Sequence, residues 1–172
     1  MSGKLGRVYR KELQNALEKC QFIEETLRMC IFSAVEIARL QLSTQFPVKY
    51  NSEDISKLPL GTLVSIFSKI NDDTALHRDL KSITRDRNDV AHRSLLFSLG
   101  ELGDKNHMTE ATEKMKDIVT RATDIHYRLL DVRWALLRSL SEVRRSVGKV
   151  HPGDTARLPA KAQQGRRTSY GR

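Results

Sequence analysis

Apolar residues recur at helical spacing along two long segments, one toward each end of the chain. In residues 4–44 they follow one another at steps of three and four, and a second such stripe runs through residues 108–147. Neither long helix can bury its stripe alone, so we expect an all-α helical bundle in which the two long helices pack antiparallel. The stripes comprise Tyr9, Leu13, Ala16, Cys20, Ile23, Leu27, Cys30, Ala34 and Ala38 in the first segment, and Ala111, Met115, Ile118, Ala122, Ile125, Leu129, Val132, Leu136, Leu140, Val143 and Val147 in the second.

Two or three shorter helices are expected between the long ones. A loop over residues 45–59 contains two prolines, and a short helix follows it from about residue 60 to residue 70. The segment Asn71-Asp72-Asp73-Thr74 breaks that helix and offers an N-cap for the next one, which continues toward residue 87.

Several apolar side chains lie outside the regular stripes. Six further apolar residues widen the stripe of the first long helix, so we expect the second half of that helix to be the more deeply buried: Phe22, Met29, Ile31, Phe32, Val35 and Ile37. Trp134 lies beside the stripe of the last helix and is expected to anchor a contact between helices, or alternatively an interface with a partner.

Charge is unevenly distributed along the chain. The 172 residues suit one domain and carry a net charge of +9. Residues 148–172 hold six Lys or Arg and one Asp, a charge of +5, so residues 1–147 supply the remaining +4. We therefore divide the chain into a helical domain over residues 1–147 and a basic tail over residues 148–172. The tail is expected to be disordered. It either adds salt-sensitive affinity for nucleic acid or is simply a solvated end of the chain.

The cysteines and the hydropathy indicate where the protein works. Cys20 and Cys30 lie on one helix about 15 Å apart, too far for a disulfide, so we expect free thiols in the reducing cytoplasm. No apolar run approaches the roughly 18 residues of a membrane span, and the charged N-terminus has no apolar signal core. No metal-ligand spacing or nucleotide-binding loop is evident, so neither a metal nor another cofactor is expected.

The segment Arg87-Asn88-Asp89-Val90-Ala91-His92 carries the candidate chemistry. A histidine transfers protons near neutral pH, and an arginine neutralises a phosphate as charge builds on it. The two groups together therefore suit the cleavage of RNA without a metal. Two other pairs, Arg121 with His126 and Arg145 with His151, have similar spacing, but neither arginine is followed by an asparagine.

With Asn88 after the arginine, this segment resembles the motif of the HEPN superfamily, an arginine and a histidine separated by four to six residues. The resemblance covers roughly residues 4–147, although its specific part is these six residues. It implies a small helical bundle of the kind found in ribonucleases of toxin, abortive-infection and RNA-guided defence systems. It also implies that two motifs face each other across a dimer.

The residues around the motif have alternative roles. Arg87 and His92 are about 140° apart on an ideal helix, so a distorted helix end or a shared cleft would have to bring them together. Arg85 shares the face of His92 and is the alternative arginine. Arg93 is a further candidate phosphate contact, and Asp89 is a candidate for fixing the histidine tautomer. Each of these side chains is equally consistent with an ordinary charged surface or a salt-bridged turn.

The sequence therefore predicts a metal-independent endoribonuclease, a toxin or antiviral-defence effector. His92 would transfer protons, Arg87 would stabilise the transition state and Asn88 would position one of them. RNA is the expected partner, together with a second copy of the chain or a larger complex with a partner protein. The alternative is a non-catalytic helical module that binds a protein or nucleic acid, with the motif in a structural role.

Overall fold

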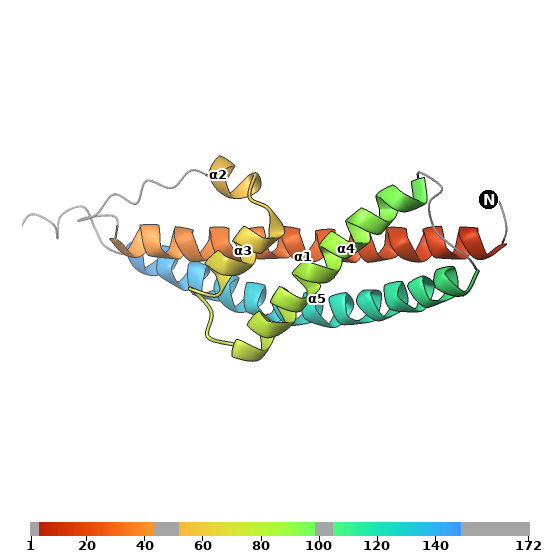
Figure 1. Ribbon diagram of the computed structural model, residues 1–172. Helices are drawn as coiled ribbons and strands as arrows, with labels where there is room; N and C mark the ends of the chain where they lie inside the picture. Colours follow the sequence, from red (N-terminus) through yellow and green to blue (C-terminus); the bar gives the residue numbers. More distant parts are fainter. Residues whose placement is uncertain (1–3, 43–51, 99–104, 149–172) are drawn as a thin grey trace, which may run out of the picture.

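The computed structural model describes residues 4–42, 52–98 and 105–148, which form five helices and, within those ranges, no strand. Their order is α1 Lys4–Leu42, α2 Ser52–Ser56, α3 Leu60–Phe67, α4 Thr74–Ser98 and α5 Lys105–Val147 (Figure 1). The expected all-α bundle, with two long helices and three shorter ones, is confirmed. The predicted loop over residues 45–59 is described from residue 52 on, where it contains α2, and the tail after residue 148 lies outside the described residues.

The two long helices run in the same direction, so the expected antiparallel arrangement is wrong. Where they touch, the residue numbers of both helices rise together: the ring of Phe22 stacks on His126 at 5.7 Å, and Glu36 lies 3.7 Å from Arg144. Figure 1 shows both helices running from the N-terminal end of the molecule toward its opposite end. The reason is α4, which at 25 residues is long enough to return the chain along the pair before α5 begins.

The predicted stripes form most of the core. In α1 the residues from Tyr9 to Cys30 on the stripe are buried, and in α5 those from Ala111 to Leu129 are buried as well. The extra apolar residues of α1 meet the expectation only in part. Ile31 is buried and Val35 packs against the core, whereas Phe22, Met29 and Phe32 are 40%, 44% and 49% exposed. They miss the core because α3, α4 and α5 together cover only part of the circumference of α1.

Helix α4 begins at a capped end. The Oδ1 atom of Asp73 accepts a hydrogen bond from the backbone N–H of Leu76 at 2.8 Å, and Asn71 accepts one from the N–H of Asp73. This is the predicted N-cap, and it satisfies a donor that the first turn of the helix would otherwise leave open.

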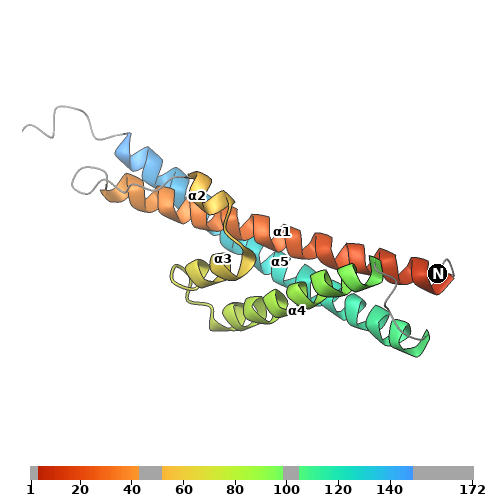
Figure 2. The same cartoon turned by 45° about the horizontal axis from the view of Figure 1, so that its top comes forward.

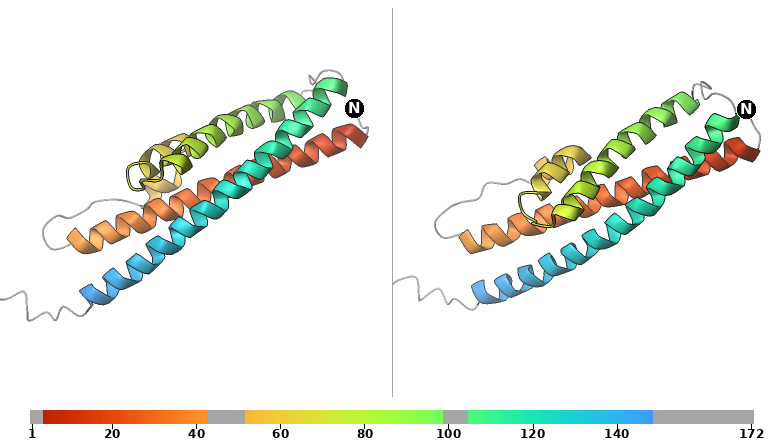
Figure 3. Two further views of the ribbon diagram at one scale, coloured as in Figure 1. Left: turned by 90° about the horizontal axis from the view of Figure 1, so that it is seen from below. Right: turned by 60° about the horizontal axis from the view of Figure 1, so that its bottom comes forward.

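A ladder of ion pairs fixes α4 along α5. Arg128 donates to Asp79 at 2.7 Å, and Arg121 donates to Asp86 at 2.9 Å. At the next level Lys114 donates to Asp89. The residue number falls along α5 as it rises along α4, so the two helices are antiparallel. Helices α3 and α4 thus lie together on one side of the α1–α5 pair (Figures 2 and 3).

Candidate functional site

The Arg87–His92 segment lies inside α4, which continues unbroken to Ser98. The expected distorted helix end is therefore not present at the motif. A regular helix places the two residues about 140° apart, on different faces. His92 is exposed, whereas Arg87 is partly buried.

One exposed row of α4 gathers most of the polar chemistry. We call it the α4 stripe; its members recur at steps of three and four, and all are exposed: Arg78, Lys81, Arg85, Asn88 and His92. Within the described ranges, no side-chain hydrogen bond or ion pair involves Lys81, Arg85 or His92, while Arg78 lies 3.6 Å from Asp79. Three cationic side chains thus lead along one face to a histidine. Arg85 and His92 share this face, as the spacing of seven predicts.

Arg87 lies on the flank of α4 that faces α3 and α1. It lines a cavity of about 340 Å³ together with Asn88, Glu24 and the first residues of α3, from Leu60 to Thr62. Within the described part of the chain, its guanidinium has no ion pair. Asn88 belongs both to this cavity and to the α4 stripe, so the two surfaces are adjacent.

Asp89 and Arg93 form a clamp between helices. The carboxylate of Asp89 accepts hydrogen bonds from Lys114 of α5 and from Arg93, the latter at 3.2 Å. The hydrogen bond from Lys114 is the main reason that the pKa of this carboxyl lies below its usual range, and Arg93 lowers it further. The structure therefore brings Asp89 to Lys114 and Arg93, with no hydrogen bond between it and His92 among the described contacts.

The second arginine–histidine pair, Arg121 and His126, makes ion-pair and ring contacts between helices. Arg121 donates to Asp86 of α4 at 2.9 Å and to Asp117 at 2.8 Å. His126 stacks on Phe22, and its pKa is lowered by burial and by the nearby charge of Lys19. His151 of the third pair lies outside the described residues.

The sequence reasoning missed two members of the α4 stripe, Arg78 and Lys81. A signal was available, because both lie at helical spacing from Arg85 and His92. A motif of six consecutive residues does not extend to Arg78 and Lys81. A continuous helix brings together residues three, four and seven apart instead.

No protein family, curated protein or solved structure matches this chain, so the HEPN resemblance rests on the residues quoted for it. Among the described residues there is no group of three or more His, Cys, Asp or Glu side chains arranged to hold a metal ion. None of the described helices is long and apolar enough to cross a membrane.

Proposed function

We propose that this protein is a metal-independent endoribonuclease of HEPN type, a toxin or antiviral-defence effector, that binds RNA along the α4 stripe. The observation that supports the proposal best is the row of exposed cations that ends at an exposed histidine. From Arg78 to His92 the row is about 21 Å long at 1.5 Å per residue, enough to follow several nucleotides of a single strand. Exposed cations on one face are the usual means of holding a phosphate backbone.

His92 supplies the proton transfer in this proposal. Its imidazole accepts the proton of a ribose 2′-hydroxyl, whose oxygen attacks the adjacent phosphorus. The bond from phosphorus to the 5′-oxygen then breaks, and the departing oxygen takes a proton from the imidazolium or from water. The products are a 2′,3′-cyclic phosphate and a 5′-hydroxyl. DNA lacks the attacking group and is not cleaved.

The two arginines act at different phosphates in this proposal. Arg85 shares the face of His92 and is about 10 Å from it along the axis, so its guanidinium can reach the phosphate under attack. Arg87 and Asn88 hold a neighbouring phosphate at the cavity on the α3 flank. The family resemblance instead assigns transition-state stabilisation to Arg87, and kinetics separate the two assignments.

The first test compares two histidines. We expect His92→Ala to lower the cleavage rate of a short single-stranded RNA by at least about 100-fold, because the proton-transfer group is lost. His126→Ala is the matched control, since it removes the histidine of the other arginine–histidine pair and should leave cleavage intact. Cleavage should persist in a chelator, and a DNA strand of the same sequence should stay whole. Equal activity of His92→Ala and the wild-type protein would refute the proposal.

The second test compares the arginines. Arg85→Ala should lower kcat by about 100-fold or more with little change in KM, as expected for an interaction made chiefly in the transition state. Arg87→Ala should mainly raise KM, because it contacts a phosphate in both the ground state and the transition state. The opposite pattern would transfer the catalytic role to Arg87.

Two copies can share a cleft lined by their α4 stripes only when RNA is bound between them. Two α4 stripes facing each other would bring like charges together, which costs several kcal/mol when they are close. RNA phosphates between the stripes remove this repulsion. The same stripe therefore suits either one copy along a strand or two copies around it, alone or within a larger complex.

A non-catalytic binding module is the second candidate, and it is favoured by one observation. Trp134 is 63% exposed, which suits an interface with a partner protein better than an isolated enzyme. This candidate predicts no cleavage by either the wild-type protein or His92→Ala. Melting temperatures measured beside cleavage distinguish lost chemistry from lost folding, since loss of chemistry leaves the melting temperature unchanged.

A further inference from the structure

The α1–α5 pair has a second broad face, opposite the one that packs on α3 and α4, and α2 borders it with Ile55 and Ser56. Two rows of residues seven apart lie on it: Phe22 with Met29 on α1, and Tyr127 with Trp134 on α5. These four side chains are 40%, 44%, 65% and 63% exposed. Residues seven apart share a helix face, and the face opposite the one that packs on α3 and α4 is therefore unusually apolar.

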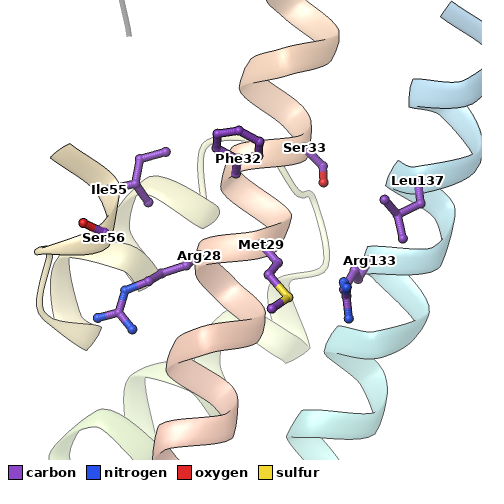
Figure 4. Close-up of a pocket in the computed structure, with 8 residues that line it drawn as sticks. All are labelled: Arg28, Met29, Phe32, Ser33, Ile55, Ser56, Arg133 and Leu137. Carbon is purple, nitrogen blue, oxygen red and sulfur yellow. The ribbon is translucent and has the colours of Figure 1, made fainter. Parts of the chain in front are cut away.

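A groove lies over α1, between α2 and α5 (Figure 4). It has a volume of about 390 Å³ and is lined by Arg28, Met29, Phe32 and Ser33 of α1, Ile55 and Ser56 of α2, and Arg133 and Leu137 of α5. Figure 4 shows Arg133 and Leu137 reaching from α5 toward the side chains of α1. The groove is thus a hollow with an apolar floor, and its volume leaves room for an indole ring.

Trp134 and this groove lie at the same level of the molecule. Trp134 directly follows Arg133, and Arg133 lines the groove together with Met29. The tryptophan is on the α5 side of the face, and much of the groove wall belongs to α1. A rotation by 180° about an axis parallel to the helices keeps the level along the helices and exchanges the two sides of the face. It therefore brings the projecting ring of each copy opposite the groove of the other.

We propose that a second copy of this chain docks on this face, with Trp134 of each copy in the groove of the other. The twofold axis runs along the α1–α5 pair, so α5 of one copy packs on α1 of the other. The two helix pairs then form a four-helix interface, which buries the apolar rows of both copies.

The face is also large enough for a stable dimer. Helix α1 has 39 residues. It is therefore about 58 Å long, and two adjacent helices are about 20 Å wide. A stable interface needs about 800 Å² from each partner, well below what this face offers. In this dimer the α4 stripes point outward on opposite sides. The proposal therefore does not depend on the proposed ribonuclease activity.

Molecular mass and the single tryptophan test the proposal together. Light scattering after size exclusion should give about twice the chain mass of 19.7 kDa. Since the chain has one Trp, its emission should shift to shorter wavelength and become less accessible to iodide as protein concentration rises and the dimer forms. A monomer at every concentration up to high micromolar overturns the proposal and leaves the face to a different partner.

Substitutions locate the interface. Trp134→Glu and Met29→Glu should each give monomers with unchanged helical circular dichroism, because both side chains are already exposed within one copy. Ile70→Glu is the matched control: Ile70 is 46% exposed but lies after α3, on the other side of the molecule, and its substitution should leave the dimer intact. A dimer that survives both Trp134→Glu and Met29→Glu would show that the copies meet elsewhere.

Discussion

At the scale of single residues, burial separates inert groups from available ones. Burial raises the pKa of the Cys20 thiol to about 11 and that of the Cys30 thiol to about 12, so both stay protonated at neutral pH. The Sγ of Cys30 lies 3.8 Å from the backbone carbonyl oxygen of Leu129 and donates to it. His92 and Arg85 are exposed instead. The thiols are thus enclosed in the core, and the accessible polar chemistry lies on α4.

Asp89 gives a prediction for acid stability. The folded state holds its pKa below the ordinary value of about 3.9, so its contribution to stability is present above that value and lost as the pH falls through the folded pKa. We expect Asp89→Asn to melt lower than the wild-type protein near neutral pH, and the difference to vanish in strong acid. Melting followed by circular dichroism across this range checks the expectation.

Asp131 provides the control for this measurement. It is an exposed aspartate without an ion pair in the described part of the chain. Asp131→Asn should follow the wild-type melting curve at every pH. A constant difference between Asp89→Asn and the wild-type protein down to strong acid would contradict the role given to the Lys114 contact.

At the scale of helices, α4 determines where the candidate site lies. Its first turn is capped by Asp73, its buried side packs through Leu76, Leu80 and Ile83, and its acidic flank pairs with α5. The α4 stripe is the side that remains. The ladder of ion pairs selects one register for α4 on α5, although pairs this exposed each contribute at most about 1 kcal/mol.

The N-cap gives a prediction for α4. Asp73→Ala removes the acceptor for the N–H of Leu76 and the contact with Arg128. We expect its melting temperature to fall by a few degrees. Asp73→Asn should recover most of the loss, because asparagine caps as well as aspartate. Asp72→Ala, at an exposed neighbour, should change little. Equal loss in the alanine and asparagine variants would assign the effect to the Arg128 contact instead of the cap.

At the scale of the whole molecule, α4 packs on one face of the α1–α5 pair and leaves the opposite face exposed. Helix α4 returns along the α1–α5 pair and covers one face (Figures 2 and 3). The residues of the α4 stripe are exposed. The opposite face carries Met29 and Trp134. Binding of RNA and binding of a second copy are therefore assigned to opposite sides, and neither obstructs the other.

The basic tail gives a prediction for the whole chain. A variant that ends at Gly148 lacks six Lys or Arg, so it should bind single-stranded RNA more weakly, with a shallower dependence of affinity on salt. The slope should fall by about 0.7 for each phosphate that the tail neutralises in the full-length chain. Cleavage at saturating RNA should be unchanged, because the α4 stripe is retained. An unchanged salt slope in binding assays would show that the tail does not bind RNA.

Helix content and the residues of the core could be predicted from the sequence. The stripe from Tyr9 to Cys30 is buried as its spacing predicts, and Asp73 caps α4 as its residue type predicts. The angular separation of Arg87 and His92 also follows from their numbers, once the helix through them is continuous. These features are local, because helical periodicity and capping depend on residues within a few positions of each other.

The tertiary structure alone decided the direction of α5, the exposure of Trp134 and the cavity beside Arg87. The direction of α5 relative to α1 depends on how many helices run along the pair before α5 begins. The spacing of apolar residues on a helix is the same whichever way the helix runs. Trp134 is apolar enough for a core but is 63% exposed, because burial requires a neighbouring helix and none of the described helices covers this side chain. Arg87 lines a cavity because α3 packs across α1 and α4 there, a contact between segments far apart in the sequence.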